Sequence, residues 1–454
     1  MTPRRRRSSA LSLSLSSLAV GALAVTGLVV GPASAAMAAD GAISGRVTVP
    51  AVAGSHRFVV QAWDVAGDPR DADLVASTER TLGAGATWDY SLTGLENGSY
   101  VVRVVEEPTG SGVPTVGDQF WLRTDWVGDS TKVAVTGGPV TAVDFAPEAW
   151  SFSSARISGS DRYGTSVAST QSVDPGVPVL YIASGGGWAD ALSAAPAAAV
   201  QGGALLLTDP DQLFPVTSAE ITRLAPKKVV VVGSELTVSA AVFQQIDAVA
   251  GTVVRIGGTD RYDTSRRIVA DAFPAGSAED VFLATGGNFP DALSVGPVAG
   301  RLGEPVLLVD GANAALDAAT RAAVSRLDPT TAVVLGQEPS ISAGIQAELT
   351  SAGLVDRTTR IGGESRYATS RLINEAYAPA ELTDTTYLAS GEGFADALSG
   401  AAIAAADGSP ISLSRPECVP AATVDSLKRL HLDYAVVLGS ELTLSAEVGR
   451  VAAC

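Results

Sequence analysis

The sequence predicts an α/β protein in which three tandem doubly wound repeats follow an N-terminal all-β domain. Three motifs recur three times in the same order within residues 155–454, and each copy alternates apolar runs with helix-forming runs. Continuous apolar strands separated by helices indicate parallel sheets covered on both faces. Residues 40–148 instead contain short alternating strands between glycine turns, which is typical of an antiparallel domain.

Residues 1–39 have the pattern of a secretory signal peptide. Four arginines at 4–7 precede an apolar run over 11–30, and the small residues at 33–35 and at 36–38 both fit a cleavage site. An uncleaved membrane anchor is the alternative, and the adjacent arginines leave a twin-arginine export route open. We expect a secreted protein at the cell wall or cell surface, with no integral membrane anchor in its mature chain.

The domain at 40–148 is predicted to be a β-sandwich. Runs rich in Val, Thr and aromatic residues occur at 42–49, 57–63, 87–92, 98–105, 131–135 and 140–145. The segments 43–47 and 92–100 resemble carboxypeptidase-regulatory-like or collagen-adhesin B-type sandwiches, which implies a spacer or adhesive domain. No catalytic constellation occurs here, and the lone His56 in a loop is expected at the surface.

The three repeats span 155–254, 255–359 and 360–454. Their first motif contains Arg-Tyr-x-Thr-Ser and occupies 156–166, 255–265 and 360–370. The second is a glycine-rich turn before Asp-Ala-Leu-Ser, at 184–193, 285–294 and 390–399. The third is an apolar run with a glycine near its end, at 229–234, 332–337 and 435–440. In the first repeat we expect strands at 179–183, 204–208 and 228–232 and helices at 190–201, 217–224 and 239–250. A Ser-Ala pair after each third motif is expected to start a helix.

The second motif places an aspartate where a strand meets a helix. These aspartates are Asp190, Asp291 and Asp396. Each is expected to cap or charge the helix start, at the strand ends where open α/β sheets bind ligands. The turns lack the Gly-Lys-Ser/Thr of a P-loop, which disfavours nucleotide binding. No Gly-x-Ser-x-Gly surrounds Ser193, Ser294 or Ser399, which disfavours serine-hydrolase chemistry.

The first motif carries one arginine per repeat ahead of its tyrosine. These are Arg162, Arg261 and Arg366. They are expected to pair with the aspartates of the second motif or to contact an anionic ligand, and the two interpretations are compatible. Arg266, Arg267 and Arg371 add positive charge nearby. Thr165 and Ser166 are expected to cap a helix.

The composition excludes several function classes. The 454 residues carry a formal net charge of −17 and 46% hydrophobic residues, so the chain is globular and unsuited to wholesale binding of nucleic acid. Its two histidines are too few for zinc or triad chemistry in three repeats, so no metal, cofactor or catalytic residue is expected. Cys418 and Cys454 predict a disulfide in an exported chain, with two unrelated thiols as the alternative.

Together the three motifs resemble the cell wall-binding repeat type 2 family over roughly residues 155–454. The resemblance implies Toprim-like repeats in a pseudo-threefold arrangement. It also implies non-covalent binding of an anionic secondary wall polymer, a cell-wall polysaccharide, in the clefts between repeats. Two features depart from the pattern: Glu364 and Ser365 stand where the second repeat has Thr259 and Asp260, and Ser412 interrupts an apolar strand. Both would weaken the third site if these segments line its cleft.

We therefore expect an exported surface protein, not an enzyme, that its repeats anchor to the wall while the β domain is displayed. A cell-wall-modifying hydrolase of the amidase type, or an accessory to one, is the alternative. A structural protein that contacts protein partners in a surface layer is a third hypothesis. Because an acidic chain repels an anionic polymer, anchoring predicts arginines clustered at the clefts and acids facing away.

Overall fold

The computed structural model describes residues 41–65, 73–107, 113–121, 132–377 and 383–454. The predicted signal peptide at 1–39 lies outside these residues. Within them, no helix combines the length and the apolar character needed to cross a membrane.

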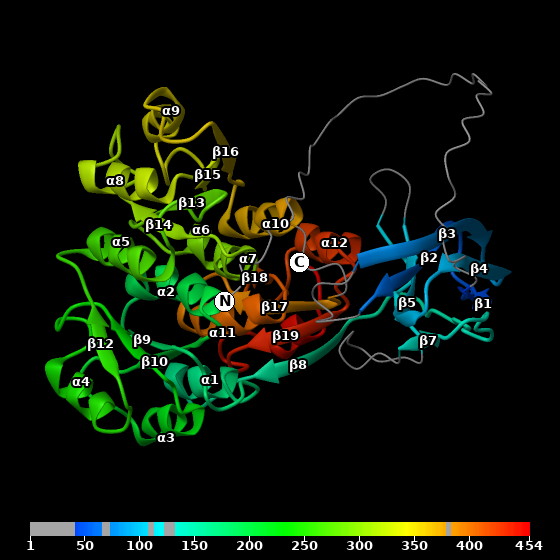
Figure 1. The fold of residues 1–454 in the computed structure, drawn as a ribbon, viewed down its shortest axis with the longest axis horizontal. Coiled ribbons are helices and arrows are strands. Elements are labelled where there is room, and N and C mark those ends of the chain that lie inside the picture. Colours follow the sequence, from blue (N-terminus) through cyan, green and yellow to red (C-terminus); the bar gives the residue numbers. More distant parts are fainter. Residues whose placement is uncertain (1–40, 66–72, 108–112, 122–131, 378–382) are drawn as a thin grey trace, which may run out of the picture. The chain divides into compact units, whose positions relative to one another are not determined.

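The N-terminal domain consists of two antiparallel sheets with a shared core (Figure 1). One sheet pairs β1 (Gly41–Thr48) with β4 (Thr87–Leu95). The other contains β3 (Asp73–Gly83), β2 (Ser55–Asp64), β5 (Gly98–Glu106), β6 (Gln119–Phe120) and β7 (Val133–Val135). The predicted alternation is clear in β4, where Trp88, Tyr90 and Leu92 are buried between exposed neighbours. The all-β character of this domain is confirmed.

His56 is buried, and the prediction of a surface histidine is wrong. It lies in β2 with 4% of its surface exposed. Its Nδ1 is 2.8 Å from Oε1 of Glu106, which is also buried. The backbone N–H groups of Thr115 and Val116 donate to the same carboxylate. A buried polar side chain needs such partners, and these come from segments distant in sequence.

The repeat region forms three four-stranded sheets whose strands all run parallel. The first contains β10 (Ala204–Thr208), β9 (Leu180–Ser184), β11 (Val229–Val232) and β12 (Val253–Ile256). The second contains β14 (Val306–Val309), β13 (Asp280–Thr285), β15 (Thr331–Leu335) and β16 (Arg357–Ile361). The third contains β18 (Ile411–Ser414), β17 (Thr385–Ser390), β19 (Tyr434–Leu438) and β8 (Ser153–Ile157). The central strands are buried apart from the first residues of β13 and β19, as the apolar runs predicted.

The sheets do not coincide with the sequence repeats. In each sheet the last strand carries the Arg-Ile start of the next repeat, so β12 and β16 belong to the preceding sheet. The strand that opens the first repeat, β8, pairs with β19 of the last one, with Ile157 opposite Leu438. The three repeats are therefore joined to one another in a closed ring of strand exchanges.

Thirteen helices cover these sheets in the described part of the chain. They are α1 (Arg162–Ser169), α2 (Ala189–Val200), α3 (Pro215–Leu224), α4 (Ala240–Asp247), α5 (Arg261–Ala272), α6 (Pro290–Leu293), α7 (Val295–Leu302), α8 (Ala318–Leu327), α9 (Ala343–Ser351), α10 (Arg366–Ala376), α11 (Ala395–Ala406), α12 (Ala421–Arg429) and α13 (Ala446–Gly449). The Ser-Ala pairs do start helices, with Ser239, Ser342 and Ser445 at the N-caps. Thr165 and Ser166 instead lie inside α1 and are buried, so they are not its cap; Asp161 caps α1.

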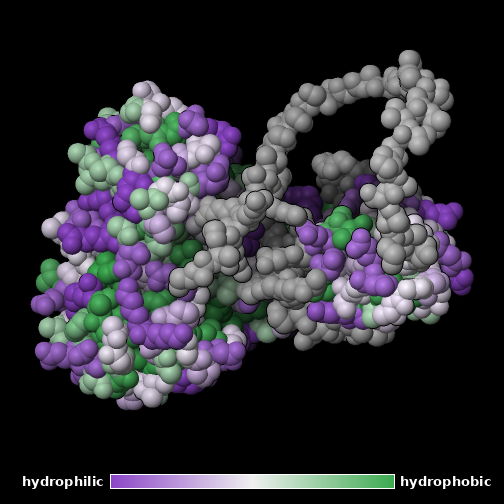
Figure 2. Space-filling model, in the orientation of Figure 1, coloured by the Kyte–Doolittle hydropathy of each residue, from purple (hydrophilic) through white to green (hydrophobic). Residues whose placement is uncertain are grey.

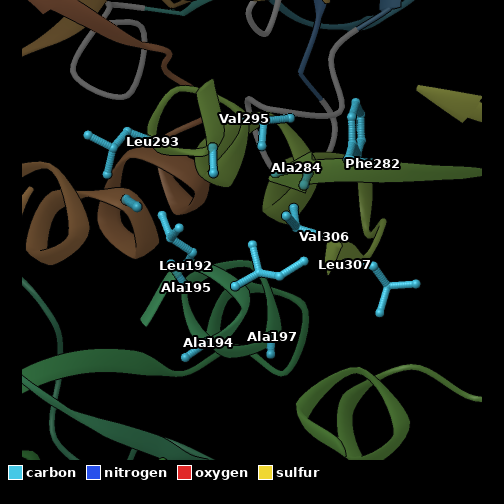
Figure 3. Close-up of a cluster of buried hydrophobic side chains, with 14 of the residues drawn as sticks. Leu192, Ala194, Ala195, Ala197, Phe282, Ala284, Leu293, Val295, Val306 and Leu307 are labelled. Atoms are coloured by element: carbon cyan, nitrogen blue, oxygen red, sulfur yellow. The ribbon is translucent and has the colours of Figure 1, made fainter. Parts of the chain in front are cut away.

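Three equivalent helices, α2, α7 and α11, pack against one another and link the repeats (Figure 1). Their contact uses small residues: a Cβ added at Gly300 would lie 2.7 Å from the Cβ of Ala199 and 2.9 Å from that of Ala405. Figure 3 shows Leu192 and Ala195 of α2 in the same apolar cluster as Leu293. Alanines in α2 and α11 and glycines in α7 thus allow three helix backbones to approach closely.

The C-terminal residue is held against the last repeat. The Cα atoms of Cys418 and Cys454 lie 5.6 Å apart, a separation that fits a disulfide bond. The N–H of Cys454 also donates to the carbonyl of Val419 at 3.0 Å.

Candidate functional site

The aspartates of the second motif lie against the glycines of the third motif. A Cβ added at Gly233, Gly336 or Gly439 would come within 2.4, 2.3 and 2.3 Å of the Oδ2 atom of the repeat's own aspartate. All three glycines have positive φ, at 96°, 84° and 97°. Glycine is required here because the turn needs this conformation and leaves no room for a side chain. The glycine of the third motif therefore leaves the space that the aspartate carboxylate occupies.

The aspartates place a negative charge in the first turn of their helices, as predicted, but the alternative prediction that they cap these helices is wrong. The N-cap residues of α2, α6 and α11 are aromatic and make no side-chain capping bond. Asp190 instead accepts hydrogen bonds from Thr237 of its own repeat and Thr264 of the next repeat. Asp291 accepts one from Ser340 Oγ at 2.8 Å. Asp396 is bonded by Thr165 of the first repeat, so Asp190 and Asp396 both face a boundary between two repeats.

The arginines of the first motif hold the glycine-rich turn of their own repeat. Nη1 of Arg162 donates to the carbonyl of Gly185 at 2.5 Å, and Nη1 of Arg261 to that of Gly286 at 2.7 Å. Arg366 bonds Gly391 in the same way. Among the described residues none of these arginines lies within salt-bridge distance of an aspartate of the second motif.

Each of these arginines also reaches the preceding repeat. Arg261 lies over the ring of Trp188 at 4.9 Å, Arg366 over Phe289 at 5.8 Å, and Arg162 over Phe394 at 5.6 Å. The aromatic residues contact one another, with ring centroids 6.2 Å apart for Trp188 and Phe289 and 5.8 Å for Phe289 and Phe394. Such cation–π and edge contacts fix the guanidinium groups at the repeat boundaries.

These contacts create clefts between repeats. The cleft between repeats 1 and 2 has a volume of about 280 Å³ and is lined by Trp188, Asp190, Leu236, Thr237, Asp260, Arg261 and Thr264, among others. The cleft between repeats 3 and 1 has a volume of about 430 Å³ and is lined by Asp161, Arg162, Thr165, Glu392, Phe394, Asp396 and Thr443, among others. Both are assembled from corresponding positions of two neighbouring repeats.

Burial changes the acidity of two of the aspartates. The pKa values of Asp190 and Asp396 lie above the ordinary aspartate value, because desolvation disfavours the charged form. Hydrogen bonds from the threonines and the charge of the next repeat's arginine oppose this rise only in part. Groups with this balance of forces are common at binding sites.

The Asp-Ala-Leu-Ser serines are structural. Ser193 and Ser265 lie 2.7 Å apart through their hydroxyl oxygens, and Ser294 and Ser370 show the same bond across the next repeat boundary. Ser193, Ser294 and Ser399 are at most 1% exposed. Their burial leaves no room for a substrate, which agrees with the absence of a hydrolase motif around them.

The other predicted arginines lie outside the two clefts. Arg266 bonds Thr320 at 3.0 Å and pairs with Asp317. Arg267 pairs with Asp263 at 3.0 Å, and Arg371 pairs with Glu375 one helical turn away. None of these three arginines belongs to the residues that line the described clefts.

The departures of the third repeat have structural explanations. Ser365 caps α10 in place of the aspartate found in the other repeats, with its Oγ accepting from the N–H of Ala368. Ser412 is buried in β18 and bonds Asn374 at 3.1 Å, so it does not line a cleft. Ser412 is therefore polar within an apolar strand because it accepts a hydrogen bond from the buried Asn374.

Sequence reasoning missed two sets of residues. The first arginine of each first motif donates to the carbonyl of the positive-φ glycine, as Arg255 does to Gly233 at 3.0 Å. The aromatic residue before each Asp-Ala-Leu-Ser lines the clefts. Their recurrence in all three repeats was visible in the sequence, but only the fold shows that they meet at repeat boundaries.

These features define a class of protein: a repeat protein whose equivalent clefts lie between successive repeats. The chain matches the family described as cell wall binding domain 2 (CWB2) over residues 156–243, 255–346 and 360–449. These matches cover more than half of the chain, so the protein belongs to this family and its repeats form a cell-wall-binding region.

Two curated relatives share this region. The chain is 28% identical over 295 residues to "N-acetylmuramoyl-L-alanine amidase LytC" of Bacillus subtilis, covering 65% of this chain and 57% of the relative. It is 28% identical over 296 residues to the "Amidase enhancer" of the same organism, covering 64% of this chain and 39% of the relative. The chain therefore matches well under two thirds of each relative's length.

Two solved structures from Clostridium difficile have a similar fold. Cwp8 superposes with a TM-score of 0.59 at 23% identity, covering 66% of this chain and 51% of the other. Cwp6 superposes with a TM-score of 0.59 at 17% identity, covering 90% of this chain and 68% of the other.

Proposed function

We propose that the protein is exported and anchored non-covalently to the cell wall through the clefts between its repeats. The observation that carries this proposal is the repeated cleft, in which an aspartate and an aromatic residue of one repeat face an arginine of the next. Equivalent clefts suit a polymer, because several weak contacts to one chain add up to a high avidity. The polymer is an anionic secondary wall polysaccharide, and the three arginines act as hydrogen-bond donors to it at the repeat boundaries.

Several finer features belong to the same proposal. The repeats are Toprim-like units in a pseudo-threefold arrangement, and the N-terminal domain is a β-sandwich that serves as an adhesive or spacer module. Residues 1–39 are a signal peptide, and Cys418 and Cys454 form a disulfide after export. The ring of strand exchanges supports the pseudo-threefold arrangement, and the 5.6 Å separation of the two cysteine Cα atoms supports the disulfide.

We further propose that the chain binds but does not catalyse. Among the described residues no group of three or more His, Cys, Asp or Glu side chains is arranged to hold a metal ion. The names of the two curated relatives favour a second candidate, in which the chain assists an amidase that acts on wall material. This candidate needs no catalytic residue of its own.

Co-sedimentation of the mature chain with cell walls tests the anchoring proposal. We expect pelleting with intact walls and its loss after acid extraction of secondary polymers. Replacing Arg162, Arg261 and Arg366 together by alanine should abolish pelleting. Arg267→Ala is the matched control, since Arg267 is exposed and pairs on its own helix.

Two outcomes would redirect the interpretation. Equal pelleting with extracted and intact walls would indicate a protein partner or peptidoglycan instead of a secondary polymer. No pelleting with either wall would reject anchoring, and stimulation of an amidase would then be the function to assay.

A further inference from the structure

The charges in the clefts do not suit an anion. In the cleft between repeats 1 and 2, the lining includes two carboxylates, Asp190 and Asp260, and one basic side chain, Arg261. The cleft between repeats 3 and 1 contains the corresponding arginine and gains a further exposed acid, Glu392. The expectation that acids face away from the clefts is therefore wrong.

The arginine is also already engaged. Nη1 of Arg261 donates a hydrogen bond to the carbonyl of Gly286, and the guanidinium lies over the ring of Trp188. The remaining N–H groups of the guanidinium can still donate hydrogen bonds to a ligand. A phosphate entering the cleft would also meet the neighbouring carboxylates, which repel it.

Apolar surface is exposed beside these polar groups. Leu236 is 95% exposed and lines the cleft between repeats 1 and 2 together with the half-buried Trp188. Leu442 occupies the corresponding position of repeat 3 and is 98% exposed, next to Thr443 of the other cleft. On the face drawn in Figure 2, hydrophobic and hydrophilic residues are interspersed over the repeat region. Isolated exposed leucines need no partner, but these two occupy equivalent positions in two repeats, one in a cleft and one beside a cleft, which points to a shared role.

From these observations we propose that each cleft holds an uncharged sugar unit of the wall polymer, while the polymer's negative groups stay outside. The proposal rests on the wall-anchoring function and specifies the ligand of the same site. Asp190 accepts hydrogen bonds from sugar hydroxyls, and Arg261 donates to them or to an acyl carbonyl. Trp188 and Leu236 contact the apolar face of the ring or an N-acyl methyl group.

The salt dependence of binding tests this assignment on the full mature chain. Affinity for purified walls is measured as NaCl rises from about 0.05 to about 0.5 M, which shortens the Debye length severalfold. Binding of a neutral sugar should stay constant or strengthen, because salt screens the repulsion between an acidic protein and an anionic wall. A fall in affinity of about tenfold or more would overturn the proposal, because it would show that the clefts bind charge.

Two substitutions test the same idea at single residues. Glu392→Gln removes a cleft carboxylate at a position where the other repeats have glycine. If the cleft holds a neutral sugar, Glu392→Gln should change the affinity for the wall by at most about twofold. If the cleft holds an anion, the substitution should tighten binding by about fivefold or more. The second result would overturn the proposal.

Trp188→Ala should weaken wall binding by about fivefold or more, because the apolar platform of one cleft is lost. Trp188→Phe is the matched control, since Phe289 and Phe394 occupy this position in the other repeats, and should retain binding. Urea unfolding of each variant shows whether the fold is intact. Unchanged binding by a folded Trp188→Ala variant would overturn the proposal that Trp188 contacts the sugar. Absence of wall binding by the unmodified chain at every salt concentration would instead reject the anchoring function itself.

Discussion

At the scale of single residues, the repeated motifs are parts of one contact. Gly336 gives the backbone a φ of 84° and leaves room for Asp291, which in turn bonds Ser340. The same set recurs around Asp190 and Asp396. The three motifs therefore recur together in each repeat because their residues contact one another.

Replacing Gly336 by alanine should destabilise the protein by about 2–4 kcal/mol, through backbone strain and displacement of the Asp291 carboxylate. Gly353→Ala is the matched control, because Gly353 has a φ of 65° but no atom within 4 Å of an added Cβ. It should cost only about 1 kcal/mol. Urea unfolding measures both, and equal losses would show that contact with the aspartate is unimportant.

Glu304 makes the stability depend on pH. Burial raises the pKa of Glu304 from 4.5 to about 7. As pH rises from about 4.5 to about 7 the unfolded chain ionises this group first, so the folded state loses up to about 3 kcal/mol of stability, and none below pH 4.5. The change in unfolding free energy caused by Glu304→Gln should therefore be more favourable at pH 8 than at pH 4. Urea unfolding of the variant and the unmodified protein at each pH measures it. A pH-independent effect of Glu304→Gln would contradict the assignment.

At the scale of elements, strand β8 closes the ring of repeats. The N–H of Ser153 donates to the carbonyl of Asp433 at 3.0 Å, and the ladder continues to Ile157 opposite Leu438. Nη1 of Arg156 adds a bond to the carbonyl of Gly439 at 2.7 Å. A strand that starts repeat 1 in sequence thus completes the sheet of repeat 3.

Ala155→Pro should remove a ladder bond from β8 and lower the free energy of unfolding by about 1–3 kcal/mol, although the side chain of Ala155 is exposed. Ala446→Pro is the control, because Ala446 is the first residue of α13 and proline is tolerated at that position. Thermal unfolding followed by circular dichroism measures both variants. An unchanged melting temperature for Ala155→Pro would show that the closing strand contributes little.

At the scale of the whole repeat region, helices α2, α7 and α11 form a shared core. Gly300 lies where the other two helices approach, and no side chain fits there without displacing Ala199 or Ala405. The three repeats therefore depend on one another for stability.

Gly300→Leu should destabilise the repeat region by about 3 kcal/mol or more and reduce binding at every cleft, because the repeats move apart. Gly251→Leu is the matched control, since nothing lies within 4 Å of a Cβ added at Gly251. Calorimetry measures the effect. If Gly300→Leu altered only part of the unfolding transition, the repeats would be independent units.

Sequence patterns alone predict the three α/β repeats, the all-β domain, the serine N-caps and the aspartates and arginines that line the clefts. Periodicity and internal repetition are local signals, so a single chain reveals them. Only the tertiary structure decided that β8 belongs to the last sheet, that His56 is buried on Glu106, and that the arginines hold glycine carbonyls and face the preceding repeat. These features depend on which distant segments pack together, and packing between repeats is set by shape and burial that no local pattern records.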